Sequence, residues 1–170
     1  WDASQREANL LDGAAHFYDT YECADGRYIS VGSIEPQFYA LLMQLAALPE
    51  ADFGNQHDVA KWPEMTDKLA AVFMQKSQAQ WCEIMEGTDV CFAPVLSFVE
   101  APSHPANVAR NTYIEVDGVT QPAPAPRFSR TPSGVAHGAH SLGEDTALTL
   151  SAMGFAESEI QKLRDAGSIG

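Results

Sequence analysis

The residue best suited to catalytic chemistry is Glu35, which lies where a strand-like run ends and a predicted helix begins. Residues 28–39 read YISVGSIEPQFY, and Pro36 directly follows the carboxylate. A carboxylate just before a helix is stabilised by the free N–H groups of the first turn and by the helix dipole. These residues alone favour an ordinary helix start over an active-site carboxylate that orients a histidine or holds charge at a cleft.

The histidines are the other groups suited to acid–base chemistry, and none of them shows metal-ligand spacing. His16 precedes the first strand and could line a cleft, although a partly exposed structural histidine is the favoured interpretation. His137 and His140 lie in a Gly-rich stretch, where metal binding is the minor interpretation. The full set is His16, His57, His104, His137 and His140. We therefore expect no metal site.

Three tyrosines cluster on the first predicted hairpin: Tyr18, Tyr21 and Tyr28. Ordinary cross-strand packing explains them, and this interpretation is favoured over a flat aromatic wall for a ligand. The chain contains no GxGxxG, P-loop, HExxH or GxSxG pattern. The common sequence signals of nucleotide, metalloprotease and hydrolase sites are therefore missing.

A hairpin and a helix must position Glu35. The β-rich runs 17–23 and 28–32 flank an Asp-Gly turn, which is a strong hairpin signal. Behind Glu35, apolar residues recur with the spacing of one helix face as far as a stop at Pro49. The predicted face consists of Phe38, Leu41, Leu42, Leu45 and Leu48.

The middle of the chain predicts a loop over residues 50–62 and then two further helices. Pro63 opens the first of these, and the pair Ser77 and Gln80 forms a capping box for the second. Residues 90–95 are apolar but contain a proline, so they predict a short edge strand.

The last third of the chain predicts a short helix at 97–101, which Pro102 and Pro105 then end. A second hairpin over 113–121 follows, and after it an extended Ala-Pro stretch. Two short helices, at 144–153 and 157–166, close the sequence.

These elements predict an α+β fold, in which a small domain combines hairpins with a three-helix cluster. We divide the chain into a lead-in at 1–13, a small α+β domain at 14–125, an extended linker or return segment at 126–143 and C-terminal helices at 144–170. The Ala-Pro stretch and the linker indicate that residues from about 127 leave the main module and dock elsewhere.

Composition excludes several classes of partner. The 170 residues include 23 acidic and 10 basic side chains, a net charge of −13, which argues against nucleic acid or an anionic membrane. No apolar run is long enough to span a bilayer. Cys23, Cys82 and Cys91 show no CxxC spacing and are interpreted as reduced thiols of a cytoplasmic protein.

Four segments resemble the α-methylacyl-CoA racemases of the family III CoA-transferase (CaiB/BaiF) superfamily. They are FYDTYECADGRYISVGSIEPQFYALL, GTDVCFAPVLSFVEA, APAPRFSRTP and LGEDTALTLSAMGFAESEIQKLRDAG. They follow the family's order and cover nearly the whole chain from about residue 17 to residue 167. The D-G-x-[YW] pattern is shared across the superfamily, whereas I-E-P-Q-F is typical of the racemase branch.

The resemblance implies a fold and an activity. Such enzymes pair a Rossmann-like large domain with a small α+β domain, and two chains interlock so that the active site lies between domains of different chains. They move the proton next to an acyl-CoA thioester, without metal or redox cofactor, and CoA is part of the substrate. A histidine and an aspartate of the large domain do this chemistry in the family.

This chain lacks the matching histidine and aspartate segments, so it resembles the C-terminal portion of such an enzyme. Its last helices would return to the missing large domain, and the chain alone is expected to be inactive. Glu35 carries over as the active-site carboxylate that orients the histidine. By the same route Tyr18 and Ile34 become expected wall residues for the acyl-CoA thioester.

Two alternatives stay open. One is a fragment of a family III CoA-transferase that forms acyl-CoA from a carboxylic acid, against which Glu35 and Pro36 argue. The other is a free-standing, non-catalytic interaction module. The racemase interpretation also implies a homodimer for the intact enzyme.

Overall fold

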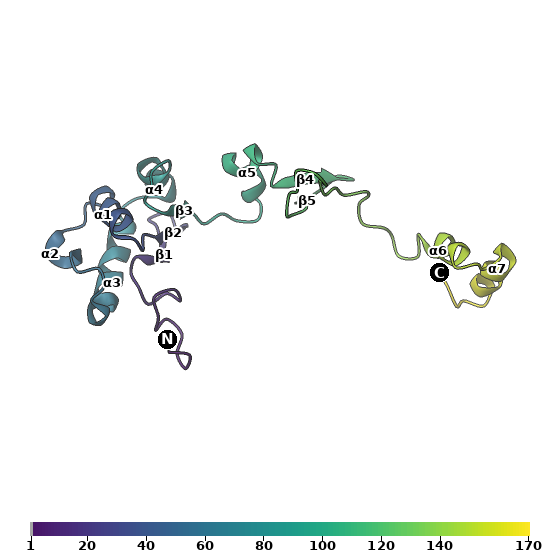
Figure 1. Cartoon of the computed structure of the whole chain (residues 1–170), viewed down its shortest axis with the longest axis horizontal. Helices are drawn as coiled ribbons and strands as arrows, with labels where there is room; N and C mark the ends of the chain where they lie inside the picture. The colour runs from purple at the N-terminus through teal and green to yellow at the C-terminus, as the bar shows by residue number, and fades with distance from the viewer. Residues whose placement is uncertain (1) are drawn as a thin grey trace. The chain divides into compact units, whose positions relative to one another are not determined.

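The computed structural model describes residues 2–170 and falls into two compact units, one ending at Phe98 and the other beginning at Val99 (Figure 1). The first unit therefore ends well before residue 125, where the sequence placed the end of the small domain. How residues 14–125, 126–143 and 144–170 group in a longer protein stays a prediction.

An antiparallel sheet of order β1-β2-β3 forms the centre of the first unit. Its strands are β1 (Tyr18–Glu22), β2 (Tyr28–Gly32) and β3 (Phe92–Pro94). In β2, Ile29 and Val31 are buried while their neighbours are not, which is the period-two pattern of a strand with one covered face. The predicted hairpin and the predicted short strand with its proline are confirmed.

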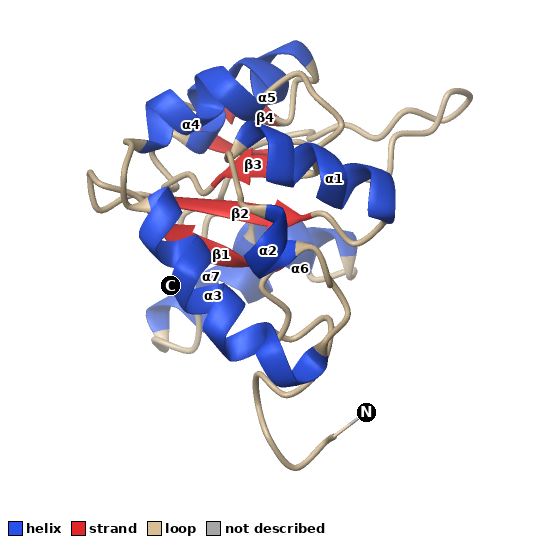
Figure 2. Ribbon diagram, turned by 90° about the vertical axis from the view of Figure 1, so that its left-hand side faces the viewer, coloured by secondary structure: helices blue, strands red, loops and turns tan. Residues whose placement is uncertain are grey.

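Helices cover one face of this sheet. They are α1 (Pro36–Leu45), α2 (Glu50–Phe53), the 3-10 turn η1 (Val59–Lys61), α3 (Trp62–Phe73) and α4 (Gln78–Met85). Both views place α1, α2 and α3 on the same side of the strands (Figures 1 and 2). The covered face of the sheet is the one that carries Ile29 and Val31.

The prediction of a loop at 50–62 is wrong, because α2 and η1 lie within it. Two acidic residues occupy the first turn of α2, where the helix dipole favours negative charge. The side chain of Phe53 at its end is only 1% exposed, so the short helix is held by burial. A helix of four residues is too short to produce a readable apolar period.

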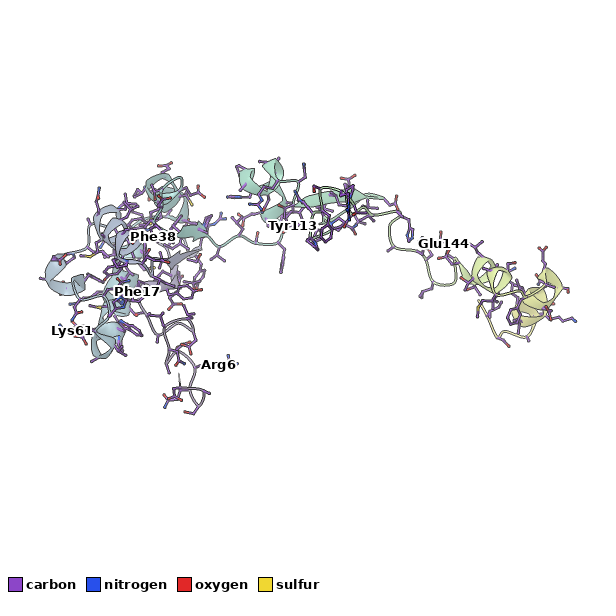
Figure 3. The ribbon with its side chains drawn as sticks, viewed as in Figure 1. Arg6, Phe17, Phe38, Lys61, Tyr113 and Glu144 are labelled. Carbon is purple, nitrogen blue, oxygen red and sulfur yellow. The ribbon has the colours of Figure 1, made fainter. Side chains whose placement is uncertain are left out.

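The buried face of α1 is also rotated from the predicted one. Tyr39, Leu42 and Ala46 are buried, whereas Phe38 and Leu41 are only half-buried. The reason is that the Tyr39 hydroxyl finds polar partners inside the core, so the ring packs inward despite its polar end. Figure 3 labels Phe38 on this helix.

Phe17 is the centre of the core of the first unit (Figure 3). Its ring makes edge contacts with Tyr39 and Trp62, with ring centroids 5.8 Å apart in both pairs. Trp81 and Phe73 form a further edge pair below the same sheet face. Helices α1, α3 and α4 are therefore joined to the first hairpin through aromatic packing.

The second unit is a series of short elements. They are η2 (Ala101–Ser103), α5 (Pro105–Ala109), the hairpin β4 (Tyr113–Val116) with β5 (Val119–Pro122), α6 (Thr146–Ala152) and α7 (Glu157–Asp165). The second hairpin and the terminal helices are confirmed. The helix predicted at 97–101 is wrong, since Pro102 and Pro105 begin helical turns instead of ending one.

Little of the second unit is buried. Among residues 99–170, Ile160 is the buried apolar side chain, while Val99, Leu142, Leu148 and Met153 are largely exposed. Such a segment gains little from burial of apolar surface and depends on its local hydrogen bonds. Between residues 2 and 170, no helix is both long and apolar enough to cross a bilayer.

Candidate active-site carboxylate

Glu35 is the residue before α1, and its exposed side chain makes no capping hydrogen bond. Its backbone is extended (φ −73°, ψ 146°), and its carbonyl accepts from the N–H groups of Phe38 and Tyr39, both at 3.0 Å. Pro36 occupies the first helical position and has no N–H to be capped. Glu35 is therefore the N-cap residue of α1 by its backbone, while its carboxylate forms no hydrogen bond to the first turn.

Ser33, two residues before Glu35, holds the backbone that leads to Glu35 through hydrogen bonds inside the first unit. It is fully buried, its N–H donates to the carbonyl of Phe17 at 3.0 Å, and its Oγ donates to the carbonyl of Val90 at 2.5 Å. Two remote segments thus hold this residue. An exposed carboxylate on a rigid backbone is the arrangement expected of a positioned functional group.

Gln56 is the polar residue near the site that the sequence analysis missed. Its side-chain Nε2 donates to the carbonyls of Ser33 (3.1 Å) and Ile34 (2.9 Å). These partners lie 23 and 22 positions away along the chain. A single glutamine in a predicted loop gives no sequence signal of such a contact.

Tyr18 lies on the uncovered face of the sheet, at a cleft of about 500 Å³. The cleft is lined by Leu11, Asp12, Gly13, Tyr18, Asp19, Thr20, Ser30, Val31, Gly32, Cys91, Phe92 and Ala93. The Tyr18 ring packs over Gly32, where a Cβ would come within 3.7 Å of it. Ile34 does not line this cleft and packs half-buried against the core. The expected contact of Tyr18 and Ile34 with a thioester stays a prediction.

Cys91 lines the cleft and lies close enough to Glu35 to be affected by its negative charge. Desolvation, together with the negative charges of Glu35 and Asp89, raises the pKa of the Cys91 thiol. The thiol is therefore protonated near neutral pH and is a poor nucleophile. Burial also raises the pKa of the Asp19 carboxyl, in the wall of the cleft. All three cysteines are free thiols, as expected.

The tyrosine cluster predicted on the hairpin does not exist as one group. Tyr21 is buried on the helix-covered face and donates its hydroxyl to the carbonyl of His16 at 2.6 Å. Tyr18 and Tyr28 are exposed on the opposite face, and the Tyr28 hydroxyl lies 3.3 Å from a carboxylate oxygen of Glu22. Side-chain alternation along β1 places Tyr18 and Tyr21 on opposite faces, and Tyr28 lies on the neighbouring strand β2.

His16 neither lines the cleft nor is partly exposed, because it is fully buried in the core. Its Nε2 lies 2.8 Å from the Tyr39 hydroxyl, which itself donates to the carbonyl of Phe53. The Nε2 atom must therefore carry the proton, and Nδ1 is a buried acceptor with no hydrogen-bond partner. Burial, with a smaller effect of His57, lowers the pKa of His16 to about 4.

The rings of His137 and His140 lie in a tilted arrangement with centroids 4.1 Å apart, and Nδ1 of His140 pairs with the carboxylate of Asp145. Throughout residues 2–170, no group of three or more His, Cys, Asp or Glu side chains could hold a metal ion. His16 and His140 have other partners, namely the Tyr39 hydroxyl and the Asp145 carboxylate. The role of Glu35 as an active-site carboxylate stays a prediction.

The fold matches two solved structures. A Mycobacterium tuberculosis protein aligns over 80% of this chain and 39% of its own, with a TM-score of 0.61 and 18% identity. A CaiB/BaiF family protein from Brucella suis aligns over 80% of this chain and 37% of its own, with a TM-score of 0.59 and 21% identity. At such identities the likeness establishes the α+β fold alone.

The sequence establishes the family. The model of CoA-transferase family III matches residues 2–146, so the chain belongs to that family. It is 47% identical over 161 residues to mouse α-methylacyl-CoA racemase and 42% identical over 173 residues to the human racemase. These matches cover 93% and 96% of this chain but only 42% and 43% of those relatives.

Proposed function

We propose that this chain is the C-terminal portion of an α-methylacyl-CoA racemase, an isomerase that epimerises 2-methylacyl-CoA thioesters. The observation that carries the proposal is the 47% identity to the mouse racemase over 93% of the chain. The missing share of that relative supports a large domain outside this sequence. A homodimer and a cytoplasmic location belong to the same proposal.

The reaction is a 1,1-proton transfer. The thioester makes the neighbouring C–H acidic, so that one side chain removes the proton and an enolate-like intermediate forms. A second side chain returns a proton to the opposite face of the same carbon. The proposal requires no metal or redox cofactor, and CoA enters as part of the substrate.

Glu35 supplies the carboxylate that this mechanism needs beside its histidine. A carboxylate at hydrogen-bond distance holds an imidazole in one orientation and stabilises its protonated form. The exposed position of Glu35 and its lack of a capping bond support this role. The histidine belongs to the large domain, so the present chain alone is inactive. Tyr18 and Ile34 are proposed as walls for the thioester.

The experiment uses the intact protein that contains this sequence, with a single epimer of a 2-methylacyl-CoA in D₂O. A racemase forms the other epimer and incorporates deuterium at C2 of both. A free carboxylic acid added as acceptor should leave the thioester composition unchanged. Retention of the C2 proton with appearance of a new acyl-CoA would instead establish the CoA-transferase activity that the family name carries. If the intact protein catalysed neither reaction, the result would favour the non-catalytic interaction module.

A further inference from the structure

We propose that Gln56 is a positioning residue that holds the backbone of Glu35 in its active orientation. This inference rests on the proposed function, because it assumes that Glu35 acts in proton transfer. Gln56 lies between α2 and η1 and is only 8% exposed. Gln56 acts on Glu35 through hydrogen bonds to the two backbone carbonyls that precede Glu35.

The Gln56 side chain clamps two consecutive carbonyls. Its Nε2 donates to the carbonyl of Ser33 at 3.1 Å and to that of Ile34 at 2.9 Å. A primary amide has two N–H groups, so these two bonds use the whole donor capacity of the side chain. The two carbonyls lie beyond the last residue of β2, outside the strand ladder.

The Ile34 carbonyl belongs to the peptide bond that joins Ile34 to Glu35. Because a peptide group is planar, a bond to this oxygen also fixes the direction of the Glu35 N–H and Cα. On the other side, Pro36 fixes its own φ angle and the Glu35 carbonyl enters the first turn of α1. The backbone of Glu35 is thus held from both ends, and only its side-chain rotations remain.

Gln56 is itself anchored to the core. Its backbone carbonyl accepts a hydrogen bond from Nε1 of Trp62 at 2.8 Å. Trp62 is buried, begins α3 and packs against Phe17. A chain of contacts therefore runs from the aromatic core through Gln56 to the peptide bond of Glu35. Precise placement matters because a shift of about 1 Å in a reacting group can lower a rate by roughly 100-fold.

The test is Gln56→Met in the intact protein, because methionine keeps the length of the side chain but donates no hydrogen bond. We expect the kcat of epimerisation to fall about tenfold while KM changes less than about twofold, since only orientation is lost. The control is Met85→Ala, which removes a buried side chain of α4 from the same core. Met85→Ala should lower the melting temperature and leave kcat unchanged.

The double variant Glu35→Gln/Gln56→Met separates positioning from general damage. If Gln56 acts through Glu35, the double variant is no slower than Glu35→Gln alone. Wild-type kcat in Gln56→Met, or losses that multiply in the double variant, would overturn the positioning role alone. Wild-type kcat in Glu35→Gln would instead overturn the proposed role of Glu35, and the positioning role with it.

Discussion

Glu35 and His16 are two ionisable side chains whose surroundings differ from what their sequence context indicates. Glu35 precedes a helix but its carboxylate does not cap it, whereas His16 precedes a strand but is fully buried. The family resemblance predicts that Glu35 is an active-site residue, whereas local helix physics alone predicts an ordinary helix start. Pro36 at the first helical position suits a helix start, since its missing N–H is one that no intrahelical bond would use.

His16 makes the stability of the first unit depend on pH. Its pKa is lowered to about 4 in the folded chain, against 6.5 for an ordinary histidine. The unfolded chain therefore binds a proton at higher pH than the folded chain. Stability is complete above about pH 6.5 and is lost as pH falls towards about 4, by about 3 kcal/mol in total.

Urea denaturation of the 170-residue chain at several pH values measures this effect. Between about pH 7.5 and about pH 4.5, the free energy of unfolding should fall by about 2.5 kcal/mol more in the wild type than in His16→Phe, which cannot titrate. Parallel pH curves for the two proteins would show that protonation of His16 does not destabilise the fold.

At the scale of elements, the parts with a local signature were predictable from the sequence. Gly26 and Gly118 both adopt positive φ angles (+73° and +79°), as the two Asp-Gly turns predict. The capping box of Ser77 and Gln80 is present in both directions. These features depend on neighbouring residues only, so single-sequence rules capture them.

The structural features that the sequence mispredicted depend on residues distant in the chain. The short helix α2 is held by burial of Phe53, and the inward turn of Tyr39 depends on polar atoms of His16 and Phe53. In the candidate site, the contact of Gln56 with the backbone before Glu35 closes a long loop. No spacing pattern records such contacts, because they arise only when the tertiary fold is complete.

The capping box at the start of α4 gives a prediction at this scale. Ser77 Oγ accepts from the Gln80 N–H at 3.3 Å, and the Gln80 side chain accepts from the Ser77 N–H at 3.0 Å. Ser77→Ala should lower the free energy of unfolding by about 1 kcal/mol in urea denaturation. Ser77→Thr keeps an accepting hydroxyl and should lose much less. Equal stability of the alanine and threonine variants would contradict a role of this cap.

At the scale of the whole molecule, the two units differ in what holds them together. The first has an aromatic core, whereas Ile160 is the buried apolar side chain of residues 99–170. The chain also spans only 42% and 43% of the mouse and human racemases that it matches. Both observations support the proposal that residues 99–170 pack on a large domain in the intact enzyme.

We propose that Glu35 completes an active site whose histidine lies in that large domain. The measurement is the steady-state rate of 2-methylacyl-CoA epimerisation by the intact protein and its Glu35→Gln variant. Glu50→Gln is the matched control, because Glu50 is also an exposed carboxylate at the start of a helix. We predict that Glu35→Gln lowers kcat by roughly 100-fold with little change in KM, while Glu50→Gln is unaffected. An unchanged kcat in Glu35→Gln would contradict the account.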